Sequence, residues 1–171
     1  MNADTVTAIC ATAIASASFV VSVQQGRASR QHNRHSVRPV LTLWNYRRVG
    51  GTTGISLENQ GLGPAFVTTS QVWLDQVLLG RWEHDAVASI CAELRERPSV
   101  VEMNRKPWVL PAGASRFLLS VDNYDGARHS DLWDLIKNRL AMKIVYDSVY
   151  GGDAHELAYR METLAEGTPG L

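Results

Sequence analysis

The stretch that organises this chain is Thr5–Arg38, with the sequence TVTAICATAIASASFVVSVQQGRASRQHNRHSVR. Its first part, Thr5–Gly26, holds no charged side chain, and four arginines then follow closely: Arg27, Arg30, Arg34 and Arg38. A helix of about 20 uncharged, mostly apolar residues is long enough to cross a hydrocarbon core. The sequence therefore predicts a transmembrane anchor over residues 1–26, a basic juxtamembrane segment over 27–38, one folded domain over 39–161 and a disordered tail over 162–171.

A cleaved secretory signal peptide is the main alternative for this stretch. Ala13-x-Ala15 and Ala15-x-Ala17 resemble cleavage sites. A signal peptide carries positive charge before its apolar run, however, and only Asp4 precedes this one. The pattern favours the anchor over the signal peptide, and a buried globular helix comes third.

The arginines also predict an orientation and partners. Under the positive-inside rule they place the N-terminus outside and the C-terminal domain in the cytoplasm, with the protein in the inner (cytoplasmic) membrane. Arg27, Arg30, Arg34 and Arg38 would then contact anionic lipid headgroups. The small residues Ala11, Ala13, Ala15 and Ala17 lie four apart in pairs, which predicts helix self-association and a homo-oligomer. An alanine-rich anchor without self-association is the plainer interpretation.

Composition restricts the remaining classes. The 171 residues have a formal net charge of zero, yet no acidic residue occurs between Asp4 and Glu58. The chain carries no recognisable nucleic-acid-binding motif, so lipid is the simpler partner for its basic end, and no nucleic acid is expected. Cys10 would lie in the membrane span and Cys91 in the domain, so the two are not expected to pair, which fits a reducing compartment.

The junction and the first strands carry a resemblance. His32-Asn33-Arg34-x-Ser36-Val37-Arg38-Pro39, followed by Leu57-x-Asn59-x-Gly61-x-Gly63-Pro64-Ala65, resembles a group of uncharacterised small bacterial single-pass membrane-anchored proteins. The resemblance covers about a third of the chain and implies a short span before a β-rich domain, a bacterial origin and no particular activity. His35 departs from the group, in which an aliphatic residue is expected at this position.

The rest of the chain predicts a mainly β domain. Short alternating runs separated by turn residues indicate seven or eight strands, and helical spacing indicates two short helices, Glu83–Arg95 and Asp131–Arg139, with Ser130 as N-cap of the second. The expected architecture is an immunoglobulin-like antiparallel β-sandwich. A small barrel or a mixed α+β sheet is the alternative. The predicted strands are Val40–Arg48, Gly54–Asn59, Ala65–Asp75, Val100–Met103, Trp108–Leu110, Ser115–Asn123, Leu140–Tyr150 and His155–Met161.

Catalytic and metal-binding patterns are weak in this sequence. The best acidic cluster is Asp122, Asp125, Asp131 and Asp134, for which a solvated loop and helix start are favoured over a cation site. The loop from Asn59 to Ala65 lacks a following helix or a nearby lysine, so a structural corner is favoured over a phosphate site. His32 and His35 lack further ligands nearby. We therefore expect no catalytic residues, no metal and no cofactor.

These features lead to two functional hypotheses. The first is a non-catalytic, membrane-anchored interaction or scaffold module that holds an unknown protein partner through the edge strands or loops of its domain. The alternative is a membrane effector that oligomerises on a signal and permeabilises the bilayer, as in bacterial defence. An enzyme is placed last, because no constellation of residues supports one.

Overall fold

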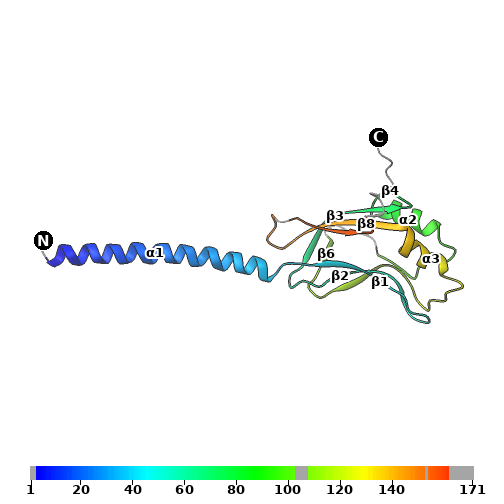
Figure 1. The fold of residues 1–171 in the computed structure, drawn as a ribbon, viewed down its shortest axis with the longest axis horizontal. Helices are drawn as coiled ribbons and strands as arrows, with labels where there is room; N and C mark the ends of the chain where they lie inside the picture. Colours follow the sequence, from blue (N-terminus) through cyan, green and yellow to red (C-terminus); the bar gives the residue numbers. More distant parts are fainter. Residues whose placement is uncertain (1–2, 103–107, 153, 162–171) are drawn as a thin grey trace. The chain divides into compact units, whose positions relative to one another are not determined.

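A computed structural model describes residues 3–102, 108–152 and 154–161 of the chain, which divides into two units, Met1–Val37 and Arg38–Leu171 (Figure 1). The first unit contains one helix, α1 (Ala3–Ser36). Among its described residues, the second unit contains nine strands and short helical segments. The predicted disordered tail, residues 162–171, lies outside the described residues.

The predicted transmembrane helix is wrong. No helix within the described part of the chain is both long enough and apolar enough to cross a membrane. Within α1, the Ser16 and Ser22 hydroxyls donate hydrogen bonds to the carbonyls one turn earlier, both at 2.8 Å. The prediction of an inner-membrane location depended on this span, and we do not propose it.

The first sheet of the second unit has four antiparallel strands in the order β1-β2-β7-β5. Ile55 and Leu57 of β2 are fully buried, as their alternation predicts. The register shifts beside Ile55, where Leu119 and Phe117 face consecutive residues of β2 and Leu118 is the extra residue of a bulge. This bulge explains why Leu118 and Leu119 are both buried. The strands are β1 (Leu41–Tyr46), β2 (Thr53–Asn59), β5 (Val100–Val101) and β7 (Ser115–Val121).

The second sheet has five strands, with the path β4-β3-β8-β9 and a short β6 that pairs with the start of β3. Strands β3 and β4 form a tight hairpin in which Asp75 and Gln76 both have left-handed backbone, with φ of 49° and 69°. All pairings in this sheet are antiparallel. The strands are β3 (Ala65–Leu74), β4 (Val77–Arg81), β6 (Trp108–Leu110), β8 (Leu140–Asp147) and β9 (His155–Tyr159).

One hydrophobic core lies between the two sheets. Leu41, Ile55 and Leu119 enter it from the first sheet, and Val72 and Met142 enter it from the second. Two helical segments cover one end of these layers, α2 (His84–Ala92) and α3 (Ser130–Asp134), the latter continuing as a π-helical turn over Leu135–Arg139 (Figure 1). If the strands are lettered A to G in chain order, with β4 as C′ and β6 left out, the sheet orders become A-B-E-D and C′-C-F-G. This is the strand order of immunoglobulin-type sandwiches.

The structure confirms the mainly β character and corrects several local predictions. Strand β4 was not predicted, because Asp75-Gln76 lacks the glycine that usually marks a two-residue hairpin. Ser130 is the first residue of α3 rather than its N-cap, and the preceding His129 makes no side-chain capping bond. The predicted strand Val100–Met103 is shorter, and its last residue lies outside the described part.

Asn59 joins the two sheets where β2 ends. Its side-chain oxygen accepts hydrogen bonds from the backbone N–H of Val40 at 3.2 Å and of Gly61 at 3.0 Å. Its amide nitrogen donates to the carbonyls of Gly63 at 2.8 Å and Leu110 at 3.0 Å. Asn59 is almost fully buried, so all four of these backbone groups depend on it. The loop after Asn59 is thus a structural corner, held by hydrogen bonds between its backbone and the Asn59 side chain.

We expect Asn59→Asp to lower the free energy of unfolding by about 3 kcal/mol or more. A carboxylate keeps the acceptor but loses both donors, and it places charge beside two buried carbonyl oxygens. Urea denaturation at neutral pH measures the change. Exposed Asn123 is the matched control, because Asn123→Asp is expected to change stability by less than about 0.5 kcal/mol. A loss below about 1 kcal/mol for Asn59→Asp would show that the corner does not need the amide.

Candidate functional site

All four carboxylates of the predicted acidic cluster accept hydrogen bonds from groups within the chain. Asp122 accepts from the Thr52 hydroxyl at 2.8 Å, and Asp125 accepts from the Ala127 N–H at 2.7 Å. The other two carboxylates accept from the Arg95 N–H and from the Asn138 side chain, each at 2.6 Å; they belong to Asp131 and Asp134. No group of three potential metal ligands occurs among the described residues. These carboxylates hold turns and helix ends in place.

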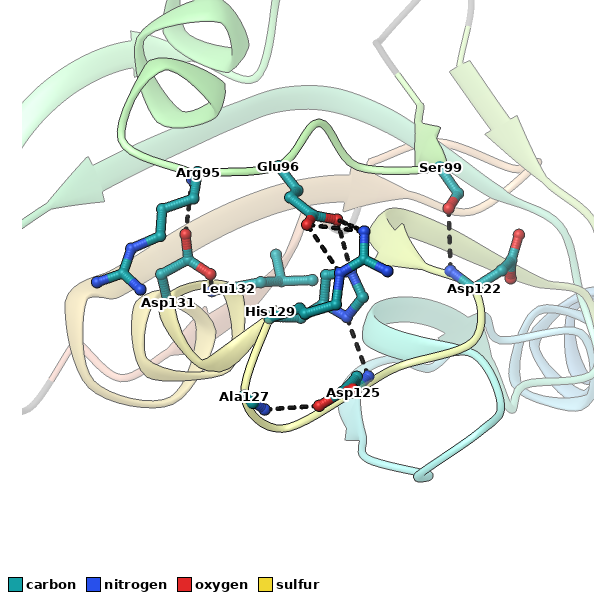
Figure 2. A network of polar contacts seen from close by, with 10 residues as sticks. Arg95, Glu96, Ser99, Asp122, Asp125, Ala127, His129, Asp131 and Leu132 are labelled. Carbon is teal, nitrogen blue, oxygen red and sulfur yellow. Dashed lines mark hydrogen bonds and ion pairs between the residues drawn. The ribbon is translucent and has the colours of Figure 1, made fainter.

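A buried histidine lies at the centre of the polar network shown in Figure 2. The His129 side chain is only 8% exposed, and its Nδ1 accepts a hydrogen bond from the Asp125 N–H at 3.0 Å. Because Nδ1 is the acceptor, Nε2 carries the proton and donates to a Glu96 oxygen at 3.1 Å. Arg128 donates hydrogen bonds to the same carboxylate from Nε and Nη2, at 3.0 and 3.1 Å. The network therefore connects the segment after α2 with the loop before α3.

This network is suited to structure rather than to acid–base chemistry. Both ring nitrogens of His129 have partners, so the ring has no free nitrogen to take a proton from a substrate. The Arg128 hydrogen bond, with a smaller contribution from His129, holds the pKa of Glu96 below its usual range. The ionised carboxylate of Glu96 thus accepts hydrogen bonds from both Arg128 and His129 and holds the two side chains in place.

We expect replacement of Glu96 by Gln to destabilise the fold at neutral pH but not in acid. The folded-state pKa of Glu96 is depressed, so its stabilising contribution is present above the unfolded-state pKa, about 4.3, and is lost as pH falls through the folded value. Urea titrations from about pH 7 to pH 3 should show the gap between wild type and Glu96→Gln closing below about pH 4. Glu83→Gln is the control, because Glu83 makes no ion pair among the described residues. A gap independent of pH would contradict the ionic role of Glu96.

A small cavity of about 170 Å³ lies beside the β3–β4 hairpin, with Asp75, Arg139 and Arg160 in its lining. Ligand sites for small molecules usually measure about 300 Å³ or more. Arg139 is already paired with Asp75 and Glu93, which keep the pKa of the guanidinium above its usual value. Arg160 donates to the Asn138 carbonyl at 3.4 Å. The charged groups that line the cavity thus have partners within the chain, and the cavity is too small for a metabolite of ordinary size.

A cluster of aromatic side chains covers the outer face of the first sheet. Trp44 and Tyr46 of β1 are 47% and 42% exposed, and Phe117 of β7 is half-buried. Trp44 and Phe117 both pair in register with Ser56 of β2, and the rings of Tyr46 and Phe117 meet edge to face at 5.8 Å. Ser56 is fully buried although it faces outward, as expected beneath these rings. We call Trp44, Tyr46 and Phe117 the aromatic patch.

Hydroxyl groups position a carboxylate beside the aromatic patch. One oxygen of Glu58, on β2, accepts hydrogen bonds from the Tyr46 hydroxyl at 2.6 Å and from the Ser115 hydroxyl at 3.2 Å. The Ser115 hydroxyl is also 2.9 Å from that of Ser56. The hydrogen bond to Glu58 raises the pKa of Tyr46, so Tyr46 remains a donor at neutral pH. Glu58 is therefore held at one place on the outer face.

Alternation along the predicted strand Val40–Arg48 separates Trp44 and Tyr46 from Leu41 and Leu43, but this pattern does not by itself identify the aromatic patch. The sequence signal that could have indicated the patch is that one face of this strand is aliphatic and the other is aromatic. Phe117 comes from a strand 71 residues after Tyr46, and its pairing depends on the β7 bulge. Sequence spacing alone does not reveal this contact.

The structure places the predicted interface and self-association residues on or next to α1. Arg27, Arg30 and Arg34 lie on the helix, and Arg38 follows it at the start of the second unit. The side chains of Arg30 and Arg34 lie outside the described residues. The side chains of Ala11, Ala13, Ala15 and Ala17 are exposed on α1. Their lipid contacts and self-association stay predictions.

Comparison of the sequence with protein-family models and with curated proteins finds no match. The resemblance to small bacterial membrane-anchored proteins therefore stays a prediction.

Proposed function

We propose that the second unit is a non-catalytic interaction module that docks a protein partner on the aromatic patch. The observation that carries this proposal is the exposure of Trp44 and Tyr46 next to Phe117 on the solvent face of an antiparallel sheet. Such a face is usually polar. Tryptophan and tyrosine contribute strongly to binding at protein interfaces, because they bury large areas at low conformational cost.

Part of the aromatic patch has a structural role. Tyr46 lies opposite Gly54, where an added Cβ would be 2.2 Å from the Leu119 carbonyl oxygen. An aromatic side chain across from such a glycine covers exposed backbone and stabilises the pair of strands. Trp44 lies opposite Ser56, which is not a glycine, and remains nearly half exposed. Trp44 therefore offers the partner more uncommitted surface than Tyr46 does.

The face of the sheet is a better docking surface than the edge proposed from sequence. The edge strand β1 contacts β9, and the Asn45 amide donates to the Tyr159 hydroxyl at 2.5 Å. That contact limits strand addition at this edge. The alternative of a permeabilising oligomer required a membrane span, and the finding on α1 removes that basis. We retain the interaction module and do not propose the anchor.

Photocrosslinking tests this proposal. With p-benzoylphenylalanine in place of Trp44, irradiation of expressing cells should give adducts of discrete mass, because a docked partner lies within reach of the side chain. Tyr150, 49% exposed and outside the aromatic patch, is the matched control and should give none. Equal adducts from both positions, or none from position 44, would contradict docking on the aromatic patch.

A further inference from the structure

Glu58 lacks a cation among the residues that the structure describes. Several carboxylates elsewhere on the surface do have one: Glu96 pairs with Arg128, Glu102 with Arg116 and Glu156 with Lys143. Glu58 instead has two hydroxyl donors, both on Oε1, and no described hydrogen bond or ion pair involves its Oε2. The half-buried carboxylate thus keeps one oxygen for an outside donor.

The neighbours of Glu58 favour a cation of a particular shape. Glu58 pairs with Thr42, and Trp44 follows two residues later on the same face of β1. Tryptophan is the best ring for a cation within about 6 Å of its face. A guanidinium is planar, stacks on aromatic rings and donates to a carboxylate in parallel, whereas an ammonium does not stack in this way.

We propose that Glu58 and Trp44 bind an arginine side chain of the protein partner, with an adjoining apolar residue of the partner on Tyr46 and Phe117. This proposal rests on the proposed function and adds the chemistry of the partner. Charge complementarity supports it, since Glu58 is a fixed carboxylate that no described cation of the chain neutralises. The two hydroxyl donors fix the carboxylate before binding, which reduces the ordering cost of association.

The test uses the full chain and two fluorescein-labelled peptides, Gly-Leu-Arg-Leu-Gly and the same peptide with citrulline, which has the shape of arginine without its charge. Anisotropy titrations at low salt should show the arginine peptide binding about tenfold more tightly. Glu58→Gln should abolish this difference, because the amide still accepts from Tyr46 and Ser115 but carries no charge. Glu156→Gln, which removes a carboxylate on β9, should leave the difference unchanged.

The outcomes separate this proposal from the proposed function. Equal binding of both peptides, lost in Trp44→Ala, would overturn the arginine site and leave docking on the aromatic patch intact. Binding that survives Trp44→Ala would count against both. Absence of binding up to millimolar peptide would overturn the arginine site. Sedimentation of the full chain identifies the source of the arginine: self-association that Glu58→Gln abolishes would support the site, with the basic segment 27–38 of a second copy as occupant.

Discussion

The fold depends on one buried side-chain amide at the corner after β2. Asn59 bonds the backbone just before β1, the loop that follows it and the last residue of β6 in the opposite sheet. Only a primary amide offers two donors and an acceptor on so short a side chain. Gly61 completes the corner, because a Cβ there would lie 2.4 Å from the Arg38 carbonyl oxygen. The hydrogen bonds of Asn59 and the close contact at Gly61 therefore fix the backbone conformation where the chain enters the two-sheet unit.

Local alternation in the sequence was sufficient to locate most strands. Ile55 and Leu57 alternate with polar residues in the predicted strand Gly54–Asn59 and are fully buried, and β6 has the predicted bounds. The sequence also indicated the two helical segments. It did not indicate β4, because a hairpin built on Asp75-Gln76 relies on left-handed backbone at two residues that seldom mark such turns. The π-helical turn at Leu135–Arg139 was likewise invisible in the periodicity.

The candidate sites were harder to predict, because each depends on contacts between distant segments. Glu96 and His129 are 33 residues apart, and only the packed structure shows that both ring nitrogens are engaged. The predicted anchor rested on an uncharged run, yet no helix in the described part of the chain is long and apolar enough to cross a membrane.

The aromatic patch follows from the same constraints that build the first sheet. Close approach of β2 and β7 requires Gly54, and the bulge at Leu118 brings Phe117 level with Ser56. Two residues of β2 on this face, Gly54 and Ser56, are small and lie buried beneath the large side chains of the two flanking strands. On the proposal that a partner docks here, Glu58 needs little ordering on binding, because two hydroxyl donors already hold its carboxylate. Under this proposal, the aromatic patch and Glu58 would select a partner by shape and charge, because the strands beneath them fix where these side chains lie.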